Sequence, residues 1–547
     1  MSNQAKFYKM AEEWFYHILE CDPVAATQVG EHRWDDRLAD RRAATLETEH
    51  RERVKALEDF SAIDTRDFTR DARIDLTIVI HLIKSSIREH EKLEWYRRDP
   101  GYYMNEVMTG VFILIMKEFA PLPDRLRSVL GRMGQVPRVL EEARANIVPE
   151  DVPPVWAEIA LEQANQAPGL FLSLLPALAA QAAPELEAEF KEMGQKTAAA
   201  TQVFAEYLQT EVLPRAEGDF AAGREVFDEM LRENHLVDYD ADELFETGRR
   251  LFRETQEQLE AVAREIDPQK SVKDILEEAK SDHPTADGLL RAYEDAMRSA
   301  RQYVIDHDIA TIPGGETLKI IETPAYLRPI LPYAAYMPPG ILETRQDGLF
   351  LVTPVDPGAG ADEQESKLKG HSYAKLPVTA LHEAYPGHHL QLVWSNRQET
   401  IPRRVSSFLS TLFIEGWAFY CEELMEELGY ISEPVQRLGR LKDQLWRAAR
   451  IILDVMLHTR GMPIEKAIDF LVEKCQLERA NATAEVRRYT GSPTQPQSYL
   501  MGKLAILEII EAYRKANPGV SLKEMHDAIL GCGSLPPRLM RERLLGE

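Results

Sequence analysis

The sequence has 547 residues, of which 44% are hydrophobic and 28% charged, and its formal net charge is −25. The length predicts two or more domains or one large helical body, and the acidic charge argues against nucleic acid or an anionic membrane as partners. The sequence contains no apolar run near the roughly 20 residues that span a bilayer, its first residues lack a signal-peptide pattern, and its four cysteines are far apart, so we expect a cytoplasmic protein.

The first 311 residues mostly have the pattern of amphipathic helices. Apolar residues recur at spacings of three and four, with charges between them, in segments 41–60, 72–96 and 242–266. Over about 312–355, Pro, Gly and aromatic residues become frequent and short runs favour β-strands. From about Ser372 the helical pattern returns and continues nearly to the C-terminus.

We therefore expect a mainly α protein, with a large helical body and a small β insert (about 312–355) next to a central cleft. A boundary near residue 311 would separate a helical N-terminal half, 1–311, from a half, 312–547, that holds the insert and the catalytic residues. A single continuous folded unit fits the same pattern.

The stretch TALHEAYPGHHLQ, from Thr379 to Gln391, holds three histidines and a glutamate within eight residues. Zinc hydrolases often carry H-E-x-x-H on one helix, because positions i and i+4 share a face and can reach one ion. Here the position four after His382 is Pro386. On an unbroken helix His388 would point about 120° away from His382, and His389 would lie about 10 Å along the axis, so neither pair could bind one ion.

Pro386 and Gly387 change this expectation. Proline removes a helical hydrogen bond and glycine tolerates unusual backbone angles, so the pair could form a short break that returns the second histidine to the first. The longer spacing would then be equivalent to H-E-x-x-H, with Glu383 beside His382 as the general base. The spacing alone leaves open whether His388 or His389 is the second ligand.

A third ligand is expected on a nearby helix. Glu415 lies in the apolar stretch FIEGWAFYCEEL, where burying an acid is costly unless it is paired or bound to a metal. Glu422, seven residues later, falls near the same face and could orient a histidine, although a surface acid or ion-pair partner is the simpler interpretation.

The blocks HEAYPGHHLQ and EGWAFYCE resemble a large bacterial family known as "domain of unknown function 885", whose members look like distant relatives of the gluzincin metallopeptidases. The likeness extends over nearly the whole chain, and HEAYPGHH is its specific part. The resemblance implies a mostly helical, gluzincin- or oligopeptidase-like zinc peptidase with His382, His388 and Glu415 as metal ligands and Glu383 as the base. It favours His388 over His389.

A peptidase of this kind needs a donor for the oxyanion that forms during hydrolysis. Candidates are Tyr499 and His458, which we favour as catalytic residues, although packing would explain His458 equally well. Arg488 could bind a substrate carboxylate, and Tyr489 lies beside it as a second substrate-binding candidate. The run at 348–355 could hold substrate backbone by strand addition.

The sequence therefore predicts a zinc metallopeptidase that hydrolyses peptides or short oligopeptides, with Zn²⁺ as its cofactor and without nucleic acid or membrane partners. Two alternatives stay open. The site could hydrolyse a small non-peptide amide, or the chain could be a metal-binding scaffold without turnover.

Overall fold

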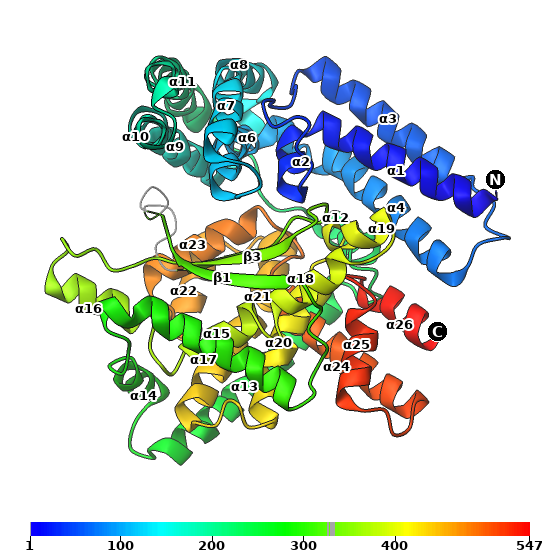
Figure 1. The fold of residues 1–547 in the computed structure, drawn as a ribbon, viewed down its shortest axis with the longest axis vertical. Helices are drawn as coiled ribbons and strands as arrows, with labels where there is room; N and C mark the ends of the chain where they lie inside the picture. Colours follow the sequence, from blue (N-terminus) through cyan, green and yellow to red (C-terminus); the bar gives the residue numbers. More distant parts are fainter. Residues whose placement is uncertain (1, 325–327, 329–333, 547) are drawn as a thin grey trace. The chain divides into compact units, whose positions relative to one another are not determined.

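The computed structural model describes residues 2–324, 328 and 334–546, which form two units. Unit 1 comprises Met1–Phe220 together with Gly340–Glu343, and unit 2 comprises Ala221–Pro339 together with Thr344–Glu547 (Figure 1). The boundary expected near residue 311 lies inside unit 2. The reason is that α13 packs along α21 of the C-terminal half, so the helices before the β insert share a core with those after it.

Unit 1 is built from α-helices that follow one another along the chain. They are α1 (Asn3–Cys21), α2 (Pro23–Val29), α3 (Ala43–Ser61), α4 (Arg70–Arg88), α5 (Trp95–Arg98), α6 (Pro100–Met116), α7 (Leu122–Met133), α8 (Val136–Asn146), α9 (Pro154–Gly169), α10 (Leu175–Ala182) and α11 (Glu187–Tyr207). One of its cores joins α1, α3 and α4 through Phe7, Phe60 and Leu76.

Unit 2 holds a small sheet and a larger set of α-helices. The helices are α12 (Arg224–Glu233), α13 (Ala241–Ile266), α14 (Val272–Ala279), α15 (Leu289–Asp306), α16 (Ala361–Lys369), α17 (Leu376–Glu383), α18 (His388–Asn396), α19 (Ile401–Arg404), α20 (Leu412–Glu427), α21 (Pro434–Thr459), α22 (Ile464–Cys475), α23 (Arg479–Thr490), α24 (Ser498–Ala516), α25 (Leu522–Leu530) and α26 (Pro537–Leu545).

The helical prediction is confirmed, since 71% of the residues are helical and 3% are in strands. The pattern at 242–266 becomes α13, which begins with a capping box between Asp240 and Glu243. The pattern at 41–60 becomes α3, and that at 72–96 becomes α4 followed by a π turn and α5. The central cleft and the likeness to gluzincins stay predictions.

The β insert is also confirmed. Strands β1 (Glu316–Glu322), β2 (Ala334–Met337) and β3 (Gln346–Val352) form one sheet in the order β1-β3-β2. β3 pairs in parallel with β1 and antiparallel with β2, so it lies in the centre with both edges occupied. Addition of a substrate strand to β3, as the sequence suggested, is therefore wrong for this sheet. Residues 325–327 and 329–333 of the insert lie outside the described residues.

The core of unit 2 positions the histidine motif. Leu412 and Phe419 of α20 pack with Leu244 of α13, Ile451 of α21 and Leu500 of α24. α17 and α18 both contact α20, and α15 contacts α17 as well as strands β1 and β3 (Figure 1). The two helices that carry the motif thus pack against α20, which is itself part of the core of unit 2.

Candidate metal centre

The histidine motif is split between two helices. α17 ends at Glu383 and α18 begins at His388, so the four residues from Ala384 to Gly387 interrupt the helical ladder. The Gly387 N–H donates to the Leu381 carbonyl at 3.0 Å. A Cβ atom on Gly387 would lie 1.9 Å from the carbonyl oxygen of His382, so only glycine fits this turn.

A tryptophan from α20 also supports the break. Trp417 Nε1 donates to the carbonyl oxygen of Pro386 at 2.8 Å, and the Trp417 side chain is fully buried. An interrupted helix leaves backbone carbonyls without their usual partners, and a buried carbonyl that lacks one is costly. Trp417 therefore stabilises the conformation that Pro386 and Gly387 begin.

The break brings His382 and His388 together, as the sequence predicted. One possible ligand atom from each of His382, His388 and Glu415 lies within 4.8 Å of the other two. His388 Nε2 is 3.6 Å from Glu415 Oε2, and the rings of His382 and His388 meet edge to face with centroids 4.7 Å apart. Among the residues that the structure describes, this is the one group of three or more such side chains close enough to share an ion.

Glu415 reaches this position because α20 crosses α24 at very short range. A Cβ atom on Gly416 would lie 2.3 Å from the backbone of Gly502, and one on Gly502 would lie 2.0 Å from the Leu412 carbonyl. Burial raises the pKa of Glu415, but the hydrogen bond to His388 and the nearby positive charges outweigh it and lower the pKa to about 2. The carboxylate is therefore ionised at neutral pH.

Glu422 orients His382. Its Oε1 atom lies 2.7 Å from His382 Nδ1, and the residue is 3% exposed, so the interpretation of Glu422 as a surface acid is wrong. The carboxylate accepts the Nδ1 proton, which leaves Nε2 of His382 to face a metal. Burial lowers the pKa of His382, but the hydrogen bond and charge of Glu422, with Glu383 and Glu415, raise it to about 9.

His389 points away from this group and is a structural residue. Its Nε2 lies 2.9 Å from Glu316 Oε2, and its Nδ1 lies 3.0 Å from the Tyr336 hydroxyl. Glu316 also accepts a hydrogen bond from Tyr385 at 2.5 Å. Because both nitrogens of His389 are used to hold α18 against the sheet, the structure favours His388 where the spacing left two choices.

Glu383 is the last residue of α17 and is half buried. It forms no hydrogen bond or ion pair with any residue that the structure describes. Burial raises the pKa of Tyr293 and of Tyr336, and the charge of Glu383 raises both further. Glu383 directly follows His382 in the chain.

His458 does not have the catalytic geometry that the sequence suggested. It is 0% exposed, its Nε2 lies 2.9 Å from the Tyr489 carbonyl, and its Nδ1 accepts the Ala222 N–H at 3.3 Å. These contacts assign the proton to Nε2 and leave neither nitrogen for a substrate. His458 therefore has a structural role, in which it ties α21 to the end of α23 and to the chain before α12.

Tyr489 and Arg488 also differ from their predicted roles as substrate-binding residues. Tyr489 is fully buried, and its hydroxyl accepts hydrogen bonds from Arg450 Nε at 2.9 Å and Trp446 Nε1 at 3.3 Å. Arg488 uses Nη2 on Glu485 and Nη1 on Gln495, both at 3.0 Å. Both residues therefore support their neighbours, and Arg488 has no free bidentate face in this conformation.

The catalytic role of Tyr499 stays a prediction. The residue lies in the first turn of α24, one turn before the Gly502 that touches α20 beside Glu415. Its ring lies under the Arg450 guanidinium, 4.6 Å from the centroid, and its hydroxyl makes no hydrogen bond with a described residue. The Tyr499 hydroxyl is thus without a competing hydrogen-bond partner in the described part of the chain.

Two important residues were missed by reasoning from the sequence. Glu316 anchors His389 from 73 residues away, and no local pattern distinguishes it from other strand acids. Arg450 is buried within the apolar run around Ile451, and a charge in such a run was a usable signal.

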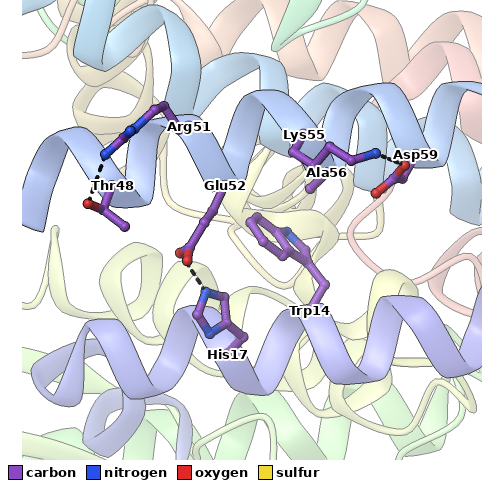
Figure 2. A pocket seen from close by; sticks show the side chains of 8 residues that line it. All are labelled: Trp14, His17, Thr48, Arg51, Glu52, Lys55, Ala56 and Asp59. Atoms are coloured by element: carbon purple, nitrogen blue, oxygen red, sulfur yellow. Dashed lines mark hydrogen bonds and ion pairs between the residues drawn. The ribbon is translucent and has the colours of Figure 1, made fainter.

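Figure 2 shows a pocket in unit 1 between α1 and α3, with a volume of about 610 Å³. Its side chains pair with one another, since His17 Nε2 lies 3.0 Å from Glu52 Oε2 and Lys55 pairs with Asp59. No residue of the candidate metal centre lines it, so the chemistry that the sequence predicts is not located there.

Comparison with known proteins gives a family and a fold. Residues 23–544 match the family described as "Bacterial protein of unknown function (DUF885)". A solved protein from Shewanella oneidensis, provisionally described as a lipoprotein of unknown function, is 25% identical with a TM-score of 0.81, covering 98% of this chain and 99% of that chain. One from Colwellia psychrerythraea, provisionally described as a lipoprotein, has the same fold at 15% identity, with a TM-score of 0.83 and coverage of 100% and 99%. No curated protein matches the chain.

The cytoplasmic localisation expected from the sequence is contradicted by these two solved proteins, since both are described as lipoproteins. In the part of the chain that the structure describes, no helix combines the length and apolar character needed to cross a bilayer.

Proposed function

The chain belongs to the DUF885 family, whose function is unknown, and we propose that it hydrolyses peptide bonds with a zinc ion bound by His382, His388 and Glu415. The observation that carries this proposal is the convergence of two imidazoles and one carboxylate within 4.8 Å. Two histidines and a glutamate are a ligand set of catalytic zinc sites, which keep one position open.

Three further features fit zinc. Tetrahedral ligands at about 2 Å from zinc are roughly 3.3 Å apart, and His388 Nε2 already lies 3.6 Å from Glu415 Oε2. Glu422 holds His382 through Nδ1, as a carboxylate does for many zinc-bound histidines. The Glu415 carboxylate is ionised at neutral pH, so binding a cation there needs no proton loss from this ligand.

Zinc would supply polarisation of the scissile carbonyl and a more acidic water. In this proposal Glu383 accepts a proton from the attacking water and delivers it to the nitrogen of the leaving amine. Tyr499 donates a hydrogen bond to the carbonyl oxygen as that oxygen becomes negative. Peptides or short oligopeptides are the proposed substrates, by analogy with other helical peptidases.

Metal content of the purified protein tests the proposal. We expect elemental mass spectrometry to find about one zinc per chain in the wild type and almost none in His388→Ala. The controls are His389→Gln, which changes the neighbouring histidine, and His307→Ala, which removes an exposed histidine of unit 2. Both should keep the metal, with circular dichroism to check folding. A wild type that takes up no zinc when zinc is supplied would refute the metallopeptidase.

A substrate panel then separates the remaining functions. Cleavage of unblocked and blocked peptides supports the peptidase, whereas cleavage of only small N-acyl amides identifies an amidase with the same metal and base. Zinc binding without turnover of either class would leave a metal-binding scaffold. Tyr499→Phe with unchanged turnover would remove the tyrosine from the mechanism but not the metal.

A further inference from the structure

Two arginines of α21 flank one tyrosine of α24. The Arg450 and Arg447 guanidinium carbons lie 4.6 Å and 5.5 Å from the centroid of the Tyr499 ring. Both also lie over Trp446, at 4.3 Å and 4.7 Å. We call these four residues and Tyr489 the arginine cluster. Stacking on aromatic faces fixes the planes of both guanidinium groups.

Arg450 is held rigidly and has one unused nitrogen. It is 4% exposed, its Nε donates to the Tyr489 hydroxyl at 2.9 Å, and its Nη2 donates to Glu485 at 2.9 Å. Its Nη1 is buried and has no hydrogen-bond partner among the described residues. The same is true of Arg447 Nε, while Arg447 Nη1 lies 3.5 Å from Asp443. Each arginine thus offers a donor that the protein itself does not use.

The cluster lies next to the candidate metal centre. Tyr499 is one turn before Gly502 in α24. The backbone of Gly502 contacts Gly416, which directly follows Glu415 in α20. The close contact between α20 and α24 therefore joins the helix that carries Glu415 to the helix that carries Tyr499 of the cluster.

A buried hydrogen-bond donor without a partner destabilises the protein. For an arginine, the strongest hydrogen bonds that would relieve this are those to an anion such as a carboxylate. We propose that the arginine cluster binds a carboxylate of the substrate, namely the terminal carboxylate of a peptide whose preceding bond is presented to the triad. This rests on the proposed function for the reaction, but the binding itself does not require turnover.

Calorimetric titration of the full chain tests the binding directly. The probes are N-acetyl-Ala-Ala, its C-terminal amide, and N-acetyl-Ala-Glu-amide, which carries a carboxylate only on a side chain. We expect the free acid to bind roughly tenfold or more tightly than the Ala-Ala amide, because charge-assisted hydrogen bonds are lost in the amide. Equal binding of acid and amide overturns the proposal. Preference for the Glu side chain over the terminal carboxylate overturns the assignment to the chain terminus.

Variants of the two arginines test whether the cluster causes the preference for the free acid over the amide. Arg447→Gln should reduce the ratio of acid to amide affinity several-fold. Arg450→Gln would leave Glu485 with Arg488 as its remaining arginine partner and could unfold the chain, so we pair it with Glu485→Gln in a double variant. In this double variant the ratio of acid to amide affinity should fall close to one. Arg437→Gln is the matched control, since this arginine is on the same helix and pairs with Glu426. If both cluster variants keep the wild-type ratio of acid to amide affinity, the proposal is overturned.

The two proposals fail in different ways. Selective binding of the acid without hydrolysis of any peptide would refute the peptidase and leave the carboxylate site standing. Peptide hydrolysis with equal affinity for acid and amide would refute the carboxylate site and leave the peptidase standing.

Discussion

The two histidines of the candidate centre differ at their second ring nitrogen. His382 uses Nδ1 on Glu422, whereas His388 Nδ1 is buried without a hydrogen-bond partner among the described residues. The carboxylate fixes both the tautomer and the ring orientation of His382. The centre therefore depends on a residue that does not itself belong to the ligand triad.

Glu422→Gln should weaken zinc binding by about 10- to 100-fold, because an amide holds the His382 proton less strongly than a carboxylate. Competition with a chromophoric chelator measures the affinity. The control is Glu427→Gln, an exposed position on the same helix, which should bind zinc like the wild type. Unchanged affinity in Glu422→Gln would mean that the hydrogen bond does not serve the metal.

A substitution of Glu383 allows zinc binding and catalytic turnover to be tested separately. Glu383→Gln keeps the side-chain size but removes the base, so we expect zinc content like the wild type and a kcat for peptide hydrolysis at least about 100-fold lower. Parallel measurement of metal content and initial rates on one preparation provides the test. Full activity in the variant would assign the base to another residue.

The element that defines the site is the interruption between α17 and α18. Gly387→Ala places a methyl group against the His382 carbonyl, where a Cβ would be 1.9 Å away. We expect loss of about 2 kcal/mol or more in the free energy of unfolding and loss of zinc, because the break must open to admit the methyl group. Chemical denaturation and metal analysis measure both.

Gly439→Ala is the matched substitution for Gly387→Ala. It lies inside α21, and a Cβ there would have no atom within 4 Å, so it should be neutral or stabilise the chain by up to about 1 kcal/mol. If Gly387→Ala behaved in the same way, the close approach would not be what selects glycine at the break.

α25 contributes a buried neutral histidine to the same region. His526 is 0% exposed, donates Nδ1–H to the Ile309 carbonyl at 2.7 Å, and accepts from the Tyr420 hydroxyl at 2.9 Å. Burial lowers the pKa of His526 to about 4, and the charge of Arg514 lowers it further. The hydrogen bond to Ile309 and the charge of Asp527 raise the pKa but do not outweigh burial.

The folded state therefore binds this proton less tightly than the unfolded chain, in which the pKa is about 6.5. The contribution of neutral His526 to the free energy of unfolding should be fully present above pH 6.5. It should fall by up to roughly 3 kcal/mol as the pH drops to 4. Denaturant unfolding at several pH values, compared with His526→Gln, measures this. A variant with the same pH slope as the wild type would show that other groups dominate.

Much of this could be predicted from the sequence where the signal is local. The apolar spacing at 242–266 defined α13 almost to the residue, and Pro386 with Gly387 indicated the break. His389 and His458 could not be assigned, because a buried structural histidine and a ligand have the same neighbours in the sequence. Their partners, such as Glu316, come from distant segments, and only the folded chain brings them together.

At the scale of the whole molecule, the chain passes between its two units more than once. Unit 1 takes Gly340–Glu343 from the middle of unit 2, so the chain crosses after residues 220, 339 and 343. Within unit 1, Leu342 N–H donates to the Val29 carbonyl at 2.8 Å, and Glu343 lies 3.7 Å from Lys117. The crossings after 339 and 343 fall inside the Pro- and Gly-rich stretch at 312–355, so the composition change there does not distinguish them from the β insert. The sequence therefore left either a boundary near 311 or one continuous folded unit.

A fragment that begins at Ala221 should retain the zinc ligands, since all three belong to unit 2. Its residues 340–343 lose their partners in unit 1, so trypsin should cut after the nearby Arg345 at least tenfold faster than in the full chain. Limited proteolysis followed by mass spectrometry measures the rates. Equal rates would show that these contacts do not restrain the segment.

The return of the chain to unit 1 also has a consequence in time. A ribosome releases Met1–Phe220 long before Gly340–Glu343, with residues 221–339 in between. At roughly 5–20 residues per second, this delay is on the order of 10 s, which is far longer than helix formation or collapse. During synthesis the helices of Met1–Phe220 therefore have time to form and collapse before the four residues that complete unit 1 are made.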